Sequence, residues 1–224
     1  MATFYSIATP IGNASDITER AVRTLSSVSA ILAEDTRVTQ KLLALLNIKK
    51  PLIAWHQHSD ARTWQRIKTL LIAGNDVAYV TDAGTPGISD PGGKLIALIA
   101  KELPQVRIEP IPGPSALAAA ISIAGIPLDE FLFLGFLPHK KGRQTLLKEI
   151  AASGRPVILF ESVHRIKKLL GELAEHDMRV VVCRELTKKF ETVYRGTAAE
   201  VLSALRPEEI KGEFVVIVHR YARA

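Results

Sequence analysis

The sequence contains very little cysteine and few aromatic residues. Its 224 residues include one cysteine, Cys183, and aromatic residues make up 6% of the chain. A single cysteine excludes an internal disulfide framework and any cluster of thiolate ligands, as is usual in a reducing compartment. The 47% apolar and 23% charged shares are those of a globular protein. They exclude collagen-like, coiled-coil and fully disordered chains.

Long hydrophobic runs are also missing. The longest, Leu117–Ile126, is interrupted by Ser122 and Gly125. It is shorter than the about 20 residues that a membrane-spanning helix needs. The first residues, Met1–Ala8, show no basic segment ahead of an apolar one and predict no signal peptide. We therefore expect a soluble, cytoplasmic protein with no membrane partner.

Two common cofactor motifs are absent. Pro10-Ile11-Gly12 stands where a dinucleotide-binding G-x-G-x-x-G would follow the first predicted strand. Gly87–Lys94 imitates a phosphate-binding P-loop, but with Gly87 and Gly92 as the loop glycines, Gly93 occupies the lysine position. Neither an NAD or FAD domain nor a P-loop is indicated.

The chain has a basic surplus. The formal net charge is +6 and the pI about 9.5, with +2 before Gly113 and +4 from there onward. This indicates a mild preference for a polyanionic partner such as RNA, although ordinary enzymes often carry a similar surplus.

Predicted strands and helices alternate along the chain, which is typical of an α/β protein with a mostly parallel first sheet. Closely spaced late strands favour a mixed second sheet. The boundary falls at Pro112–Pro114, giving domains 1–113 and 114–224. The expected strands are Thr3–Ala8, Val28–Ala33, Pro51–Trp55, Val77–Thr81, Val106–Ile111, Phe131–Gly135, Val157–Phe160, Val180–Cys183, Thr192–Tyr194 and Phe214–Val218. The expected helices are Asp16–Leu25, Leu42–Leu46, Arg62–Ala73, Gly93–Lys101, Ser115–Ala124, Arg143–Ala151, Ile166–Ala174 and Ala198–Leu205.

Polar and glycine-rich segments follow several first-half strands at their carboxyl ends. They are Thr9–Asn13, Glu34–Arg37, Asp82–Gly87 and Pro112–Pro114. Ligands of open α/β sheets bind at that edge, so we expect these segments to line one crevice. Glycines and prolines there are also explained by rigid strand-to-helix connections, and Ser115 by a helix N-cap.

Two second-half segments, Glu161–Arg165 and Arg184–Lys189, each combine a carboxylate with fixed cations after an apolar strand. A buried salt bridge, for example from Glu161 to Arg184, explains this pattern about as well as catalysis does. The occurrence of both segments at equivalent places favours a functional site.

The segment Leu137–Arg143 is basic and contains Gly142. Such a loop can hold phosphates electrostatically, or it can be an ordinary solvated turn.

His56-Gln57-His58 with Asp60 could in principle chelate a metal ion. No cysteine or third histidine stands nearby, so solvated or RNA-facing histidines are favoured and we expect no metal.

The segments in combination resemble one known group, the small-subunit ribosomal RNA ribose 2′-O-methyltransferase I group of the tetrapyrrole methylase superfamily. The resemblance runs from about Phe4 to Val218. It is carried by Thr9–Asn13, Ala33–Arg37, Thr81–Pro86, Ile111–Ser115, Gly135–Pro138, Phe160–Arg165, Arg184–Lys188 and Lys211–Glu213.

The resemblance implies a two-domain α/β tetrapyrrole-methylase-like fold that binds S-adenosylmethionine between its domains. It also implies methyl transfer to the ribose 2′-oxygen of a cytidine in the decoding region of small-subunit (16S) ribosomal RNA, within or outside the 30S subunit. A homodimer is the usual form of the group. Many members carry an acid where Thr85 stands, so Thr85 would contact the cofactor through its backbone or hydroxyl. Many members also continue past the last strand with a small helical extension, whereas the sequence here stops at Ala224.

The resemblance and the strand-end positions together predict three sets of site residues. Cofactor contacts are expected from Pro10, Ile11, Gly12, Ala83, Gly84, Thr85, Ile88, Ser115, Ala116 and Leu186. Catalytic roles are expected among Glu161, Glu185, His164, Arg165 and Arg184, with Glu161 or Glu185 favoured over Glu34 and Asp35 as general base. Substrate contacts are expected from Asp35, Arg37, Lys140, Lys141, Arg143 and Lys188.

Two other functions remain open. The first is methylation of a tetrapyrrole or another small molecule, against which the basic His139–Arg143 loop argues. The second is a non-catalytic RNA-binding assembly factor, which would not bind S-adenosylmethionine.

Overall fold

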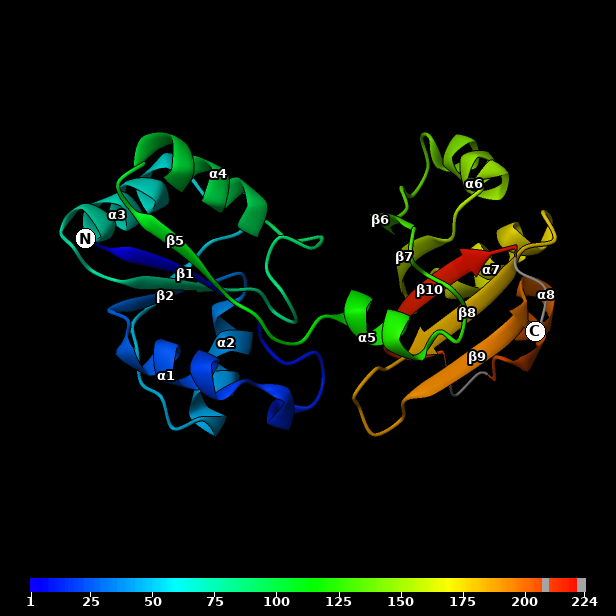
Figure 1. Ribbon diagram of the computed structural model, residues 1–224, viewed down its shortest axis with the longest axis horizontal. Helices are drawn as coiled ribbons and strands as arrows, with labels where there is room; N and C mark the ends of the chain where they lie inside the picture. Colours follow the sequence, from blue (N-terminus) through cyan, green and yellow to red (C-terminus); the bar gives the residue numbers. More distant parts are fainter. Residues whose placement is uncertain (207–209, 221–224) are drawn as a thin grey trace. The chain divides into compact units, whose positions relative to one another are not determined.

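The computed structural model describes residues 1–206 and 210–220 and divides into two compact units, Met1–Ser115 and Ala116–Ala224 (Figure 1). The sequence placed this division after Gly113. Each unit has its own sheet and its own hydrophobic core. The predicted α/β class is confirmed. Among the described residues no helix has the length and apolar character that crossing a membrane requires.

The strand–helix alternation predicts a mostly parallel first sheet, and the sheet of the first unit is parallel at every described pairing. The order of its strands is β3-β2-β4-β1-β5. Its strands are β1 (Thr3–Ile7), β2 (Ala30–Ala33), β3 (Leu52–Ala54), β4 (Val77–Val80) and β5 (Arg107–Ile111). Its helices are the 3₁₀ turn η1 (Ala14–Asp16), α1 (Glu19–Ser27), α2 (Thr36–Leu45), α3 (Ala61–Ile72) and α4 (Gly92–Glu102).

Helices cover both faces of this sheet (Figure 1). Ile67 of α3 and Leu95 of α4 pack in the core of one face, whereas Leu25 of α1 and Leu43 of α2 pack in the core of the other. The strands β2 and β4 are buried throughout because both their faces are covered, which explains their continuous apolar sequences.

Two helix starts differ from the sequence expectation because side-chain caps set them. Helix α1 begins after Thr18, whose hydroxyl accepts a hydrogen bond from Ala21 N, so the predicted helical residue Asp16 lies in η1 instead. Helix α2 begins at Thr36, well before the apolar leucines, because Asp35 caps it.

The second unit contains a mixed sheet, as predicted, and the order of its strands is β6-β7-β10-β8-β9. Only the pairing of β6 with β7 is parallel among the described pairs. Its strands are β6 (Leu132–Phe136), β7 (Val157–Ser162), β8 (Arg179–Arg184), β9 (Thr192–Thr197) and β10 (Glu213–His219). Its helices are α5 (Ala116–Ile123), α6 (Arg143–Ala152), α7 (Ile166–Ala174) and α8 (Ala198–Ala204).

Alternate residues of these strands face one core. Leu159 of β7, Val182 of β8 and Val216 of β10 pack there with Leu147 of α6 and Leu170 of α7. Helix α5 contacts β10 and is held to β9 by hydrogen bonds from the Arg195 guanidinium to carbonyls at the end of α5. The second core therefore places the carboxyl ends of β7 and β8 on either side of the first residues of β10.

Candidate active site

Three loops of the first unit meet at the carboxyl edge of its sheet. We call Thr9–Asn13, Asp82–Pro91 and Pro112–Ser115 the cradle loops; they follow the neighbouring strands β1, β4 and β5. Thr9 N donates to Gly84 O at 3.0 Å and Gly84 N donates back to Thr9 O at 3.1 Å. Thr85 Oγ1 donates to Pro114 O at 3.0 Å, so all three loops are joined by hydrogen bonds.

Gly84 is the point at which the cradle loops approach most closely. Its φ is +83°, in the left-handed region, and a Cβ there would lie 3.3 Å from Ile11 Cγ2 and 3.7 Å from Pro114 O. A side chain would therefore be strained and would press on both neighbouring loops.

Asp90 fixes the longest cradle loop. Its Oδ2 accepts from Gly87 N at 2.7 Å and from Ile88 N at 3.0 Å, and its Oδ1 accepts from Gly92 N at 2.7 Å. Sequence reasoning missed this residue, although an aspartate just before the glycines that open α4 is a recognisable capping signal.

The predicted cofactor residues of the first unit lie together at this edge. A Cβ at Gly84 would lie 3.3 Å from Ile11 Cγ2 and 4.0 Å from Ser115 Cα, so these three residues are neighbours. Gly12 and Ala83 are exposed, and Pro10, Thr85 and Ile88 are half-buried. Two other predicted contacts belong to the second unit: Ala116 is the first residue of α5, and Leu186 is buried after β8. Their cofactor roles stay predictions.

The segment after β2 also reaches the cradle loops. Asp35 N donates to Asp82 Oδ1 at 3.0 Å, and Thr81 Oγ1 donates to Glu34 Oε2 at 2.8 Å. Burial, and then the negative charges of Glu34 and Asp35, raise the pKa of Asp82. The four polar segments that the sequence placed at one edge do meet there.

Asp35 and Arg37 form an exposed ion pair with an Nη2–Oδ2 distance of 2.6 Å. Hydrogen bonds from the Arg37 side chain and backbone hold the pKa of Asp35 at about 2, below its ordinary 3.8. The predicted contacts of both residues with substrate stay predictions.

This lowered pKa makes the first unit's stability depend on acid pH. Because the folded pKa lies below the unfolded value, the contribution of Asp35 is complete above pH 3.8 and is lost as the pH falls towards 2. Asp35→Asn keeps an N-cap for α2 but loses the charge. We expect the difference in free energy of unfolding between wild type and Asp35→Asn, measured by urea unfolding, to shrink over this range. Asp16→Asn serves as control, and a constant difference for Asp35→Asn would contradict the assignment.

In the second unit, Glu161 is fully buried at the end of β7. Its Oε1 accepts from Arg165 Nε at 2.7 Å and from Ser162 N at 2.8 Å. Its Oε2 is buried with no hydrogen-bond partner among the described residues. Arg165 also donates to Leu137 O at 2.9 Å, which ties the end of β7 to the end of β6. His164 beside them is exposed.

Arg184 does not pair with Glu161, so the salt bridge considered from the sequence is wrong. Arg184 instead donates to Lys211 O at 3.1 Å and to Phe190 O at 3.0 Å. The two residues flank Phe214 of the intervening strand β10, and each finds nearer partners on its own side.

Glu185 follows β8 in a left-handed conformation with φ of +52°. It accepts from Lys188 Nζ at 2.7 Å and from Glu213 N at 3.1 Å. Burial raises the pKa of Glu185, but these hydrogen bonds outweigh burial and the pKa is lowered overall. Lys188 also donates to Glu213 Oε2 at 2.9 Å, so two carboxylates hold this predicted substrate contact.

The basic loop divides into exposed and buried cations. Lys140 and Lys141 are exposed, as a phosphate contact requires. Arg143 is only 3% exposed; its Nη2 lies 2.6 Å from Glu172 Oε2 and its Nη1 donates to Pro138 O. The side chain of Arg143 thus has structural partners, and its predicted contact with substrate stays a prediction. Arg143, Leu147 and Ile150 form one buried stripe of α6, so helical spacing could have identified it.

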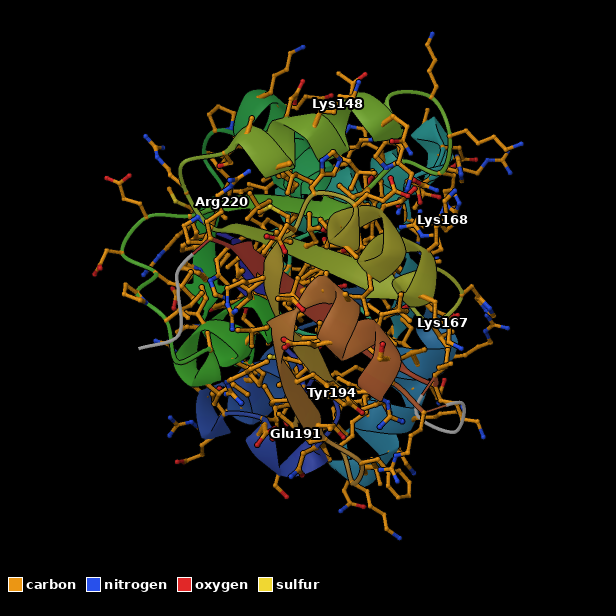
Figure 2. All side chains as sticks on the ribbon, turned by 90° about the vertical axis from the view of Figure 1, so that its right-hand side faces the viewer. Lys148, Lys167, Lys168, Glu191, Tyr194 and Arg220 are labelled. Carbon is orange, nitrogen blue, oxygen red and sulfur yellow. The ribbon has the colours of Figure 1, made fainter. Side chains whose placement is uncertain are left out.

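Further lysines stand on the helices beside this loop. Lys148 of α6 and Lys167 and Lys168 of α7 are exposed on the surface of the second unit (Figure 2). They add positive charge to the exposed sides of these two helices.

The histidine segment offers no metal site in the part of the chain that the structure describes. There, no group of three or more His, Cys, Asp or Glu side chains is arranged to hold a metal ion. Asp60 instead caps α3 by accepting from Thr63 N at 2.8 Å.

Comparison with known proteins gives the family. A model of the Tetrapyrrole (Corrin/Porphyrin) Methylases matches residues 3–202. Two relatives, both named "Ribosomal RNA small subunit methyltransferase I", come from Xylella fastidiosa and Thermotoga maritima. They are 47% and 40% identical, over 96% and 97% of this chain and 81% and 98% of their own lengths. The chain therefore belongs to the tetrapyrrole methylase family and, within it, to the ribosomal RNA small subunit methyltransferase I group.

Solved structures confirm the fold. The methyltransferase CobJ superposes with a TM-score of 0.68 at 17% identity, over 99% of this chain and 98% of its own. A cobalt precorrin-4 methyltransferase of cobalamin biosynthesis superposes with a TM-score of 0.67 at 20% identity, over 96% and 94%. At these identities the likeness concerns the fold alone.

Proposed function

We propose that the protein transfers the methyl group of S-adenosylmethionine to the ribose 2′-oxygen of a cytidine in the decoding region of small-subunit ribosomal RNA. The names of the relatives support a small-subunit ribosomal RNA methyltransferase. The motif resemblance supports the cofactor and the ribose target. The structural observation that carries the proposal is the joining of the cradle loops at Gly84, which leaves small residues facing outward.

The residues present fit S-adenosylmethionine. Gly12, Ala83 and Gly87 are exposed and have little or no side chain, so their backbone groups are free to approach a ligand. A Cβ at Gly87 would meet nothing within 4 Å. Asp82, inside one of the cradle loops, supplies negative charge at the same edge, which suits a positively charged sulfur. When bound, this cofactor supplies an already activated methyl group, so the protein has to provide orientation and proton removal.

In the second unit we assign proton removal to Glu185. Hydrogen bonds from Lys188 Nζ and Glu213 N hold its carboxylate in place. Its left-handed backbone, with that of Thr187 at +66°, is the kind of strain found at functional sites. Glu161 is completely enclosed and paired with Arg165, so it serves to position that arginine. Lys140 and Lys141 are assigned to RNA phosphates.

A glutamine substitution at Glu185 tests whether this residue removes the proton. Glu185→Gln should lower the rate constant of methyl transfer by roughly 10²–10⁴-fold, the usual contribution of a general base. The dissociation constant for S-adenosylmethionine should stay within about twofold of wild type. That change is well below a tenfold change in the dissociation constant, which corresponds to about 1.4 kcal/mol. Single-turnover assays and calorimetry measure the two quantities. Equal turnover of Glu185→Gln and wild type would remove the assignment.

A methyl-transfer assay tests the function. Purified protein and labelled S-adenosylmethionine are offered either 30S subunits that lack the modification or a tetrapyrrole acceptor. We expect label in the ribose of one cytidine and none in the tetrapyrrole. Label in the tetrapyrrole alone would support a small-molecule methyltransferase, and absence of cofactor binding would support an assembly factor. A homodimer in the cytoplasm is part of the proposal, and light scattering tests the dimer.

A further inference from the structure

A hollow of about 440 Å³ lies in the first unit beside the cradle loops, and the end of one of them, Ser89–Pro91, forms part of its lining. It is lined by Glu34, His56, Gln57, His58, Ser89, Asp90, Pro91 and Lys94. Its volume falls within the about 300–1,000 Å³ that ligand sites occupy. All its lining side chains except Pro91 are polar or charged, so its shape and chemistry suit a polar ligand.

The order of the strands places this hollow beside the cradle. Glu34 follows β2 and the histidine segment follows β3. Ser89–Pro91 ends the loop between β4 and α4, and Lys94 lies in the first turn of α4. In the sheet order β3-β2-β4-β1-β5, the hollow therefore lies at the carboxyl ends of β3, β2 and β4, and the cradle loops lie at the carboxyl ends of β4, β1 and β5. The loop after β4 borders both, which is the arrangement that a transfer reaction with two ligands needs.

Glu34 offers an acceptor in the hollow. Its Oε2 accepts from Thr81 Oγ1 at 2.8 Å, which fixes the carboxylate. Its Oε1 has no hydrogen-bond partner among residues 1–206 and 210–220. A fixed carboxylate oxygen accepts from an exocyclic amino group, as in the pairing of Glu with cytosine N4, and repels a carbonyl oxygen.

The histidines offer ring surfaces and donors. His58 N donates to His56 Nδ1 at 3.2 Å, which leaves the proton of a neutral His56 ring on Nε2. His56 N donates to Ser59 Oγ at 2.9 Å, and Gln57 Nε2 lies 3.1 Å from His58 Nε2. The segment is thus held by its own hydrogen bonds, and imidazole rings are among the surfaces on which single-stranded bases stack.

Lys94, in the first turn of α4, is the only lysine or arginine among the described residues that line the hollow. A carboxylate accepts from a base amino group, imidazole rings stack on a base plane and an ammonium binds a phosphate, so the hollow offers contacts to both the base and the phosphate of a nucleotide.

We propose that this hollow seats an unstacked nucleotide of the RNA substrate and that Glu34 selects a base carrying an exocyclic amino group. The inference rests on the proposed function and names the residue that reads the base. The hollow itself lies at the sheet edge that the cradle loops share.

Binding of short RNA tests the inference without methyl transfer. Fluorescence anisotropy compares labelled ten-nucleotide oligo(C) and oligo(U) at one fixed low salt concentration. We expect wild type to prefer oligo(C) by about tenfold, the scale of one specific base contact. Glu34→Gln, whose amide both accepts and donates, should reduce this ratio to about twofold or less. The exposed Glu19→Gln should keep the full ratio.

A second substitution examines the phosphate contact. Lys94→Ala should weaken the binding of both oligonucleotides equally, by about threefold or more, and reduce the salt dependence of binding. Lys101→Ala, at the far end of α4, should change neither the affinity nor its salt dependence. Calorimetry should show unchanged S-adenosylmethionine affinity in Glu34→Gln and Lys94→Ala.

The outcomes separate this inference from the proposed function. An unchanged oligo(C)/oligo(U) ratio in Glu34→Gln, or no preference in wild type, overturns the inference even when wild type methylates 30S subunits. Loss of S-adenosylmethionine binding in Glu34→Gln also overturns it, because the hollow would then belong to the cofactor. A wild type that binds oligo(C) selectively but methylates no ribosomal RNA overturns the proposed function and leaves the nucleotide site standing.

Discussion

Gly84→Ala is expected to weaken S-adenosylmethionine binding at least tenfold, a loss of about 1.4 kcal/mol or more in binding free energy. The added Cβ would lie 3.3 Å from Ile11 Cγ2 and 3.7 Å from Pro114 O, so it must move two of the three cradle loops. Because these loops are joined by hydrogen bonds at Thr9 and Thr85, the displacement spreads to the whole cradle. Calorimetry on the purified variant measures the effect.

Gly74→Ala is the matched control. Gly74 has nearly the same φ, +84°, and follows the end of α3, where a Cβ would meet nothing within 4 Å. Both variants should lose roughly 1–2 kcal/mol of unfolding free energy from the left-handed backbone. Only Gly84→Ala should lose cofactor affinity. Equal affinities in the two variants would show that the cradle loops do not form the cofactor site.

Arg143→Ala is expected to destabilise the second unit by about 3–5 kcal/mol, the cost of leaving one charge of a buried pair without its partner. The guanidinium is enclosed, lies 2.6 Å from Glu172 Oε2 and joins α6 to α7. Combining Arg143→Met with Glu172→Leu should recover most of the loss, since both charges are then removed. Urea unfolding measures these differences.

Exposed cations provide the contrast. The side chains of Arg155 and Glu130 form an ion pair and are 59% and 73% exposed. Arg155→Ala breaks this pair and should lower the free energy of unfolding by only about 0–1 kcal/mol. Lys141→Ala should leave stability unchanged and lower the affinity for RNA and its dependence on salt. If Arg143→Ala were as stable as wild type but bound RNA more weakly, Arg143 would be a phosphate contact, contrary to what its burial indicates.

Most of the fold could be predicted from the sequence because local patterns determine it. The apolar runs Ala30–Ala33 and Val77–Val80 are buried on both faces, and such runs predict interior parallel strands without tertiary information. The meeting of the cradle loops also follows from topology, since the ends of parallel strands share an edge. Glycine at position 84 is explained only by the structure, because its close neighbours Ile11 and Pro114 are remote in sequence.

Side-chain partners across long separations could not be predicted. Arg143 lies in a segment that reads as a basic loop, and its burial depends on Glu172 of another helix. Glu161 and Arg184 are both buried and oppositely charged, yet each binds nearer groups that sequence position does not reveal. The hollow beside Glu34 combines three chain segments and carries no continuous motif. Tertiary packing decides all of these features.

Mass-spectrometric mapping of ribose methylation in small-subunit ribosomal RNA tests the central claim most directly. RNA is compared between cells with the gene, cells without it, and cells in which the wild-type or Gly84→Ala protein is restored. We expect one 2′-O-methylcytidine to be lost when the gene is deleted, to return with the wild-type protein and to stay reduced with the Gly84→Ala protein. An identical methylation map with and without the gene would contradict the central claim.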